Sequence, residues 1–396
     1  MFFLFLILTK VAQSVILDSD LRKDQVFNDW IYVLNDQFLP WNGGITEKLI
    51  NDTFLDNGHH VIFQHIDGNL YLYDPFKYCL HNVSTNGHIN PGYYKTRCLA
   101  LVSIIKAVIN DGTAVFAKKI VNFEFVWSLD DFASWNNHLV EDSKTRQSFY
   151  VGLGAVRCWN KNTLAFPFFG SHSGWNINTT SNFSDGTIYD YTTGIANKKG
   201  VAIFRGGVDR GCSFEKDTVL DFNSWSAIHD HSRKKCGRQL LIDVAKKNSH
   251  FVDYQGSNDT FISLVDQSKI YRYVLSVEGF GGWTDRLFDL ISKSKMVVMD
   301  QEHPCDQWFE PLLKPFVHYI PIAHDFRNLP ARVAWANAHP NAVIQIQRKA
   351  RLFARKYLSK NGIISYAKAF LSLYTARVKY HVNLRKGSNL FENTKK

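Results

Sequence analysis

The chain has 396 residues, of which 45% are hydrophobic and 21% charged, and its formal net charge is +10. These values exclude a disordered linker, because a chain of this length and apolar content can bury a large core and form two domains. The positive charge suits nucleic acid, anionic lipid or a phosphorylated ligand, but lysines and arginines are spread along the chain, so charge alone selects none of them.

Residues 1–14, MFFLFLILTKVAQS, form an apolar run that includes the small residues Ala12 and Ser14 near its end. This pattern predicts a signal peptide, and the alternative is a buried first strand. No later stretch reaches the roughly 18 consecutive apolar residues that a transmembrane helix needs. We therefore expect a secretory-pathway protein without a membrane span. Glycosylation sequons agree with that compartment; they lie at Asn51, Asn82, Asn178, Asn182 and Asn258.

The first half of the chain predicts a hairpin, a helix and a buried strand. Residues 61–74 alternate around an Asp67-Gly68 turn, and residues 99–109 have helical apolar spacing. Residues 122–129, NFEFVWSL, indicate a strand that ends before Asp130 and Asp131. Open α/β sheets bind ligands at the carboxyl ends of strands, so Asp131 is a candidate base. The alternative for this acidic pair is a helix cap.

A stretch rich in Asn, Ser, Thr and Gly, residues 176–197, marks a domain boundary. We expect one domain over 15–197, a second over 198–380 and a basic tail over 381–396. The second domain alternates strands, near 200–207, 271–277, 296–300 and 317–322, with helices near 238–247 and 284–295. Such alternation predicts an α/β fold with parallel sheets. Two amphipathic helices are predicted over 342–378, separated at Asn361-Gly362.

Residues 274–290, VLSVEGFGGWTDRLFDL, run from a strand through a glycine-rich turn into a helix with Thr284 and Asp285 as candidate caps. Glycines let the backbone approach a ligand, and a helix amino terminus offers N–H groups to a diphosphate, with Arg286 available for a charged contact. The pattern is neither the dinucleotide GxGxxG nor a Walker loop. The alternative is an ordinary tight turn before a capped helix.

A second strand, AIFRGG over 202–207, also ends in glycines beside Arg205, and Arg238 follows downstream. Two arginines beside glycine turns predict an anionic ligand. His318 lies in an apolar segment and is interpreted as a structural histidine. The six cysteines contain no CxxC pair, which excludes zinc-ribbon and thioredoxin sites and favours disulfides. The histidines of HDH, residues 229–231, lack a third ligand, so no metal site is predicted.

Taken in this order, the segments resemble glycosyltransferase family 90, which includes fungal capsule-associated enzymes and Rumi-type protein O-glucosyltransferases. The similarity runs from Asp74 to Thr375 and is strongest in YVLSVEGFGGWTDRL, MVVMDQ and DQWFEPLLKPFVHYIPIAHDFRNL. AIFRGG resembles the family's strand before its donor-binding Arg-Gly-Ser. FEFVWSLDDF resembles the segment with the family's catalytic aspartate, which falls on Asp131.

The resemblance implies a GT-B fold, in which two Rossmann-like domains face each other across a cleft and the C-terminal helices pack back toward the first domain. It implies inverting transfer of a sugar from UDP, glucose first and xylose as the alternative, to a serine or threonine hydroxyl, with Asp131 as general base and no essential metal. The implied donor-binding residues are Arg205, Gly206, Gly207, Arg238, Gly279, Gly281, Gly282, Trp283, Thr284 and Arg286.

By the same resemblance, the acceptor is a secretory-pathway protein, with EGF-like repeats as the analogy, and nucleic acid is not a partner. The expected location is the lumen of the endoplasmic reticulum, with the Golgi or secretion as alternatives, and the expected state is a monomer. The cysteines Cys79 and Cys98 flank a polar loop and are disulfide candidates. A longer segment between Gly207 and Arg238 is expected to contain a Cys212–Cys236 disulfide.

Three positions depart from the family's pattern. Asp130 stands where an arginine is usual, Gly207 replaces a serine, and Glu278 begins a turn that is one residue longer. These departures motivate a first alternative, a catalytically silent homologue that binds a UDP-sugar or a lumenal protein. A second alternative is a transferase that acts on a glycan acceptor.

Overall fold

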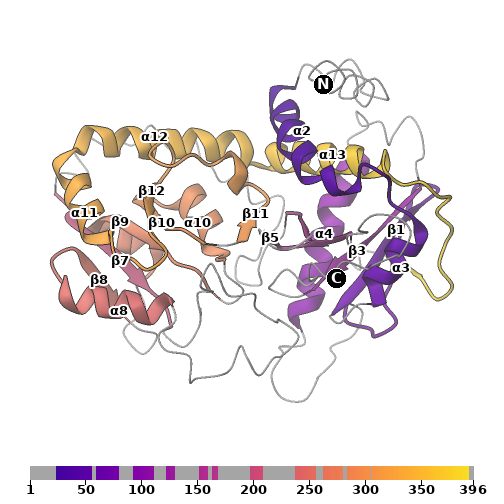
Figure 1. Ribbon diagram of the computed structural model, residues 1–396, viewed down its shortest axis with the longest axis horizontal. Helices are drawn as coiled ribbons and strands as arrows, with labels where there is room; N and C mark the ends of the chain where they lie inside the picture. Colours follow the sequence, from indigo (N-terminus) through magenta and orange to yellow (C-terminus); the bar gives the residue numbers. More distant parts are fainter. Residues whose placement is uncertain are drawn as a thin grey trace.

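The structure is a computed structural model and describes residues 24–55, 59–79, 92–110, 122–129, 151–158, 163–167, 197–207, 237–255, 262–279, 283–303 and 305–391. The described strands form two large sheets, which lie beside each other along the long axis of the molecule (Figure 1), and one separate two-stranded sheet. The α/β fold predicted from the sequence is therefore confirmed. No described helix combines the length and the apolar character needed to cross a membrane.

The first sheet has the strand order β13-β2-β1-β3-β4-β6. Its strands are β1 (His60–Ile66), β2 (Asn69–Tyr73), β3 (Phe123–Ser128), β4 (Gly152–Gly154), β6 (Thr163–Ala165) and β13 (Asn389–Leu390). The predicted hairpin is confirmed, with positive φ at Asp67 (48°) and Gly68 (82°), as a two-residue type I′ turn requires. Because such a turn joins only antiparallel strands, this sheet is mixed and not the all-parallel sheet of a Rossmann-like domain; β3, β4 and β6 alone run parallel.

Helices α2 (Gln25–Gln37), α3 (Glu47–Leu55) and α4 (Gly92–Asn110) and the short helix η2 (Leu39–Trp41) accompany this sheet. The last helix, α13 (Lys360–Thr375), packs against α2 and α4. Its Tyr366 hydroxyl donates to the Ala165 carbonyl at 2.5 Å, and its Tyr374 hydroxyl donates to the Glu124 carbonyl at 2.9 Å. The chain therefore returns to its first sheet after building the second one, as Figure 1 shows for the yellow helix.

The second sheet is wholly parallel, with the order β8-β7-β9-β10-β12. Its strands are β7 (Lys199–Arg205), β8 (Val252–Gln255), β9 (Tyr271–Ser276), β10 (Val297–Gln301) and β12 (Ile320–Ile322). Side chains alternate between its two faces. Tyr273 and Met299 share one core with α8 (Gly237–Lys247) and α11 (Leu329–Ala338), and Val274 and Val298 share another with α10 (Arg286–Lys293).

The remaining elements are α9 (Leu264–Ile270), α12 (Pro340–Tyr357), the short helix η4 (Glu310–Leu312) and a separate antiparallel pair formed by β5 (Val156–Cys158) and β11 (Cys305–Gln307). The predicted helix break at Asn361-Gly362 is wrong by two to three residues. Helix α13 begins after Ser359, whose hydroxyl accepts a hydrogen bond from the Gly362 N–H at 3.2 Å. A capping serine therefore fixes the start, and Gly362 lies inside the first turn.

The strand predicted over 317–322 is shorter than expected, because His318 lies in a turn before β12. Its Nδ1 accepts a hydrogen bond from the Lys314 N–H at 3.0 Å, and its ring packs on Phe353. Burial, together with Lys314 and Lys349, lowers the pKa of His318 to about 4. The structural role predicted for this histidine agrees with these contacts.

Replacing His318 by asparagine is expected to make the protein less sensitive to acid. In the folded state this imidazole resists protonation, whereas in the unfolded chain it takes up a proton near pH 6.5. The contribution of neutral His318 to the free energy of unfolding is therefore complete above about pH 6.5 and is lost as the pH falls toward 4. We expect His318→Asn to remove about 1–2 kcal/mol of that loss, less than the full shift because the ring is partly exposed. Urea unfolding at several pH values measures it, and an unchanged acid slope would contradict it; His381→Asn, at an exposed site, is the control.

Glu124 is a buried carboxylate in the middle of the first sheet, 2% exposed. Arg385 binds it through two hydrogen bonds, from Nε to Oε2 and from Nη2 to Oε1, both 2.7 Å long. The Tyr380 hydroxyl adds a third at 2.9 Å, and Gln64 a fourth at 2.8 Å. The last described residues are therefore fastened to the first sheet, which β13 also extends by pairing with β2.

Replacing Arg385 by alanine is expected to destabilise the fold by about 3 kcal/mol, because it leaves a buried charge without its ionic partner. Adding Glu124→Gln to Arg385→Ala is expected to recover part of that loss, since the uncompensated charge is then removed. Chemical denaturation of both variants measures this. If Arg385→Ala lowers the free energy of unfolding no more than Lys386→Ala does, at the exposed neighbouring position, the ion pair does not stabilise the fold.

Candidate donor site at the second sheet

The strand order of the second sheet defines where a ligand is expected to bind. Numbered in chain order, its strands run 2-1-3-4-5, so the direction of winding reverses between β7 and β9. Open α/β sheets bind their ligands beyond the carboxyl ends of the strands at this switch point. The loops that leave β7 and β9 there are the two glycine turns singled out in the sequence, at Gly206-Gly207 and at Gly279.

Close packing explains two of these glycines. A Cβ on Gly206 would lie 2.9 Å from the Phe204 ring, and a Cβ on Gly279 would lie 3.3 Å from the Trp283 carbonyl. The N–H of Gly279 donates to that same carbonyl at 2.6 Å, which closes the turn. A larger residue at Gly206 would press on the Phe204 ring, and one at Gly279 would crowd the carbonyl that closes its own turn.

Two arginines hold the loops together. Arg238 of α8 donates from Nη1 to the Gly207 carbonyl at 2.9 Å and from Nε to the Glu278 carbonyl at 3.3 Å. Arg286, the first residue of α10, donates from Nη1 to the Arg205 carbonyl at 2.6 Å. Both guanidinium groups also stack on Phe204, at 5.4 and 5.5 Å from its ring centre. The switch point therefore has two cations that donate hydrogen bonds to backbone carbonyls.

The two cations repel each other. Burial and, after it, the positive charge of Arg238 lower the pKa of Arg286. A bound anion would relieve this repulsion, since it would face both guanidinium groups at once. Helix α10 begins at the same place, and its N-cap residue Asp285 makes no capping hydrogen bond through its side chain.

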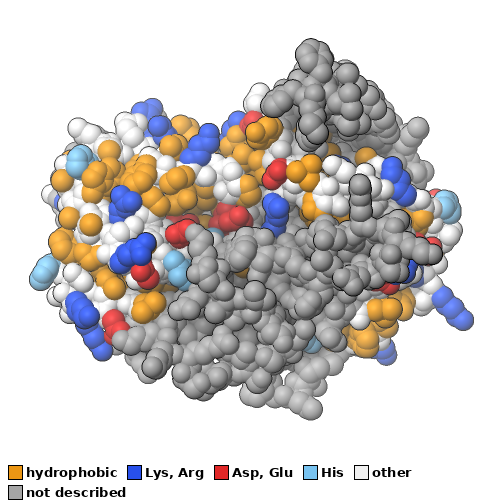
Figure 2. Space-filling view, viewed as in Figure 1, with side chains coloured by type: hydrophobic (Ala, Val, Ile, Leu, Met, Phe, Trp, Pro, Cys, Tyr) orange, Lys and Arg blue, Asp and Glu red, His pale blue; other side chains and the backbone are white. Residues whose placement is uncertain are grey.

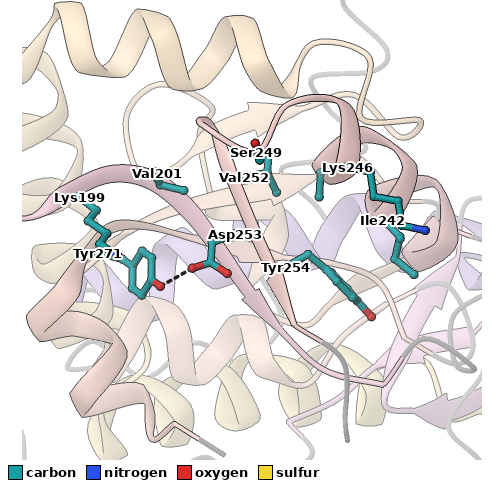
Figure 3. Close-up of a pocket in the computed structure, with 10 residues that line it drawn as sticks. Lys199, Val201, Ile242, Lys246, Ser249, Val252, Asp253, Tyr254 and Tyr271 are labelled. Carbon is teal, nitrogen blue, oxygen red and sulfur yellow. Dashed lines mark hydrogen bonds between the residues drawn. The ribbon is translucent and has the colours of Figure 1, made fainter. Parts of the chain in front are cut away.

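Arg205 is oriented differently from the expected donor-binding arginine. Its Nη1 forms an ion pair with Asp253 at 3.1 Å, and its guanidinium group lies 6.0 Å from the Tyr271 ring centre. The Tyr271 hydroxyl donates to the other oxygen of Asp253, as Figure 3 shows. Arg205 is thus engaged along β8 and β9, and its backbone carbonyl, not its side chain, joins the switch point.

A cavity of about 420 Å³ lies beside this Arg205 ion pair, between β7, β8 and α8. Figure 3 shows its lining, with Tyr254, Lys246 and Lys199 around it. It contains none of the residues predicted to bind the donor, and several lining residues, such as Lys199 and Tyr271, begin their strands. Because ligands of such sheets bind at the opposite ends of the strands, the switch point, and not this cavity, is the candidate ligand site.

Trp283 and Thr284 are buried and support the turn from inside. Gln307 of β11 donates from Nε2 to the Thr284 carbonyl at 2.8 Å. The Thr284 hydroxyl accepts a weak hydrogen bond from the Arg286 N–H at 3.4 Å. Trp283 and Thr284 therefore shape the turn. The sequence alone did not indicate that Gln307 supports it.

Glu278 does not face the turn that it begins. Its side chain is completely buried, and neither carboxylate oxygen has a hydrogen-bond partner. Burial raises the pKa of Glu278 to about 7, against the opposing charges of His324, His303 and Arg238. Its N–H donates to Gln301 Oε1 at 3.0 Å, so the strand end is tied to β10.

The predicted base lies three residues beyond β3, and both Asp130 and Asp131 are outside the described residues. The strand end before them is held by Arg97 of α4, a fully buried arginine that donates to the Leu129 carbonyl. Sequence reasoning missed Arg97, because a single arginine within an apolar helix gives no signal of its partner. Also outside the described residues are Gly281, Gly282, Cys212, Cys236, His229, His231, Asn82, Asn178, Asn182 and Asn258.

The disulfide candidates Cys79 and Cys98 form a disulfide, which joins the end of the hairpin region to α4. Cys305 of β11 is also disulfide-bonded, and the register of β5 and β11 places Cys158 opposite it. The sequon residue Asn51 lies on α3, where its side-chain oxygen accepts a hydrogen bond from Arg385 at 2.8 Å.

On the described part of the face in Figure 2, lysine and arginine side chains are scattered among hydrophobic and acidic ones. They do not gather into one basic patch there. This distribution gives no support to nucleic-acid binding by that part of the surface, which would need clustered cations.

The second half of the chain matches a known protein family. Residues 233–395 match the model of Glycosyl transferase family 90. Human protein O-glucosyltransferase 1 is 28% identical over 210 residues, covering 47% of this chain and 52% of that protein. Human protein O-glucosyltransferase 3 is 26% identical over 120 residues, covering 30% of this chain and 23% of that protein.

A viral protein is also similar: Uncharacterized protein 179R of Invertebrate iridescent virus 6 is 26% identical over 189 residues, covering 42% of this chain and 16% of that protein. The chain spans about half the length of the protein O-glucosyltransferases 1 that it matches. The resemblance predicted from the sequence is thereby confirmed: residues 233–395, which include Arg238 and Arg286 of the switch point, match Glycosyl transferase family 90.

Proposed function

We propose that this protein is an inverting, UDP-sugar-dependent glycosyltransferase with a GT-B arrangement, and that its donor binds at the switch point between β7 and β9. The observation that carries the proposal is the pair of arginines, Arg238 and Arg286, which meet on Phe204 between two glycine turns. A nucleoside diphosphate fits this place, because its charge is complementary to both cations and its oxygens can accept from the adjoining N–H groups.

In the proposed reaction, a hydroxyl of the acceptor attacks the anomeric carbon of the sugar while Asp131 takes the hydroxyl proton. The bond between the anomeric carbon and the diphosphate oxygen breaks, and its electron pair leaves with UDP. Attack from the face opposite the leaving group inverts the anomeric centre. Arg238, Arg286 and the amino terminus of α10 stabilise the negative charge that develops on the diphosphate, so the phosphate chemistry requires no metal.

The proposed acceptor is a serine or threonine hydroxyl of a secretory-pathway protein, and the proposed sugar is glucose. Protein O-glucosyltransferases among the similar proteins support this choice. The predicted signal peptide and the Cys79–Cys98 disulfide support an oxidising compartment, and we propose the lumen of the endoplasmic reticulum.

The second candidate function is a catalytically silent homologue that binds a UDP-sugar. It is favoured by Glu278, which begins a turn one residue longer than is usual in the family and whose side chain is completely buried. A catalytically silent homologue would bind UDP but would not consume a UDP-sugar.

The two functions are separated by assaying sugar release and transfer with UDP-glucose, UDP-xylose, UDP-galactose and UDP-N-acetylglucosamine. The transferase predicts that one donor is consumed, and that a hydroxyl-bearing peptide acceptor increases its consumption. Binding of UDP without consumption of any of the four donors would replace the transferase by the silent homologue.

A further inference from the structure

Three side chains gather beside the switch point, at the carboxyl end of β10. Asp300 lies in β10, His303 follows two residues after the strand, and Glu310 begins η4. Each offers a ligand atom, and these atoms lie within 4.8 Å of one another. The side chains are 5–7% exposed. None of the three belongs to the predicted donor-binding set.

The orientation of His303 fixes which of its nitrogens faces the carboxylates. Its Nδ1 lies 2.7 Å from the Cys305 carbonyl, which can only accept, so Nδ1 carries a hydrogen. Its Nε2 then points between the two acids, 3.3 Å from Glu310 Oε2 and 3.9 Å from Asp300 Oδ2. Histidines that ligate metals are commonly held in this way, with the other ring nitrogen donating to a backbone carbonyl.

Several carboxylates are buried in this interior. The Asp300 carboxylate points into the cluster, with Ser276 as its hydroxyl neighbour, and its Oδ1 is buried without a well-formed hydrogen bond to any described residue. Glu278, after the end of the neighbouring strand, is 0% exposed, and neither of its carboxylate oxygens has a partner among the described residues. Arg238 donates to the Glu278 backbone carbonyl and not to the carboxylate. Buried carboxylates need a compensating positive charge, and the imidazole of His303 is paired with both Asp300 and Glu310.

We propose that Asp300, His303 and Glu310 bind a divalent first-row transition metal, Zn²⁺ or Mn²⁺. Two carboxylate oxygens and one imidazole nitrogen form a ligand set that these ions accept. Tetrahedral ligands at about 2.0–2.1 Å from zinc lie about 3.3 Å apart, which is the distance between His303 and Glu310. Asp300 Oδ2 lies 3.9 Å from the same nitrogen, and the three ligand atoms lie within 4.8 Å of one another, so Asp300 has to move closer to complete the same geometry.

The metal has a structural role and lies apart from the phosphate chemistry. It joins β10 to η4, and the segment between them includes Gln307, which holds the Thr284 carbonyl of the donor turn. Gln301, the residue after Asp300, fixes the Glu278 N–H and the His324 carbonyl. Metal binding therefore makes the segments that support the donor site more rigid. A metal site goes beyond the proposed function, because metal binding needs neither UDP nor an acceptor.

The test uses the full chain without any nucleotide. The protein is stripped with a chelator and desalted, then given Zn²⁺ or Mn²⁺ alone, and its metal content and thermal unfolding are measured. We expect one bound metal per chain and a rise in Tm of about 3 °C at a hundredfold excess of metal over its Kd. Co²⁺ is expected to give visible absorption bands that report direct ligation.

Glu310→Gln and Asp300→Asn are expected to lose the bound metal and the rise in Tm, and Glu302→Gln, at an exposed carboxylate in the same segment, is expected to keep both. Folded wild-type protein that binds no metal at this excess would overturn the proposal and leave an ion pair of protonated His303 with the two acids. Metal content that is equal in wild type and Glu310→Gln would also overturn it. Since these measurements use no donor, they stand or fall independently of transferase activity.

Discussion

Replacing Arg286 by alanine is expected to weaken UDP binding about 30- to 100-fold. Loss of a charge-assisted contact to a phosphate in a buried place costs about 2–3 kcal/mol. Arg286 is largely enclosed, stacks on Phe204 and donates to the Arg205 carbonyl, so its guanidinium group is already oriented before a ligand arrives. Calorimetric titration with UDP measures the change.

Two further variants make this expectation specific. Arg286→Lys keeps the charge but loses the planar fork, and we expect it to weaken binding about 10-fold, between wild type and alanine. Arg332→Ala is the matched control, because Arg332 also stacks on an aromatic ring, that of Phe316 at 4.8 Å, but lies on α11. Equal UDP affinity in Arg286→Ala and Arg332→Ala would remove Arg286 from the donor site.

Replacing Asp131 by asparagine is expected to lower the rate of sugar transfer by about 10²- to 10⁴-fold while leaving UDP affinity unchanged. The physical reason is that an amide cannot take the proton of the attacking hydroxyl, although it keeps the size of the carboxylate. The buried Arg97 holds the strand end next to the acidic pair by donating to the Leu129 carbonyl.

Asp130→Asn is the natural control, because it removes a neighbouring carboxylate of the same kind. If Asp131 is the base, the two variants differ greatly in rate and resemble each other in UDP affinity. Equal loss in both would point to the charge of the pair and not to one base. Full activity in Asp131→Asn would assign the base to another residue.

The sequence predicted the elements that depend on local patterns. Alternation around Asp67-Gly68 indicated the hairpin, and the strands ending at Arg205 and at Ser276 were predicted within a few residues. Their glycine turns were recognised from the glycines that follow each strand, and the structure places the Phe204 ring and the Trp283 carbonyl close to two of them. These features are encoded within about ten neighbouring residues.

Features that depend on distant partners could not be predicted. Arg205 was expected to face the donor, but Asp253, on a strand 48 residues later, pairs with it instead. The strand order, which places the two glycine turns side by side, is a property of the whole sheet. The cluster of Asp300, His303 and Glu310 has no recognisable spacing in the sequence, because an irregular segment, and not a helix or strand, brings Glu310 back to β10.

A calorimetric titration of UDP into the full chain, in the presence of a chelator, tests most directly whether the switch point binds a nucleotide. We predict saturable binding at one site per chain, strongly weakened in Arg286→Ala and unchanged in Asp131→Asn. Absence of binding at millimolar UDP, in protein whose circular dichroism and unfolding transition show that it is folded, would contradict the assignment of the switch point as a nucleotide site.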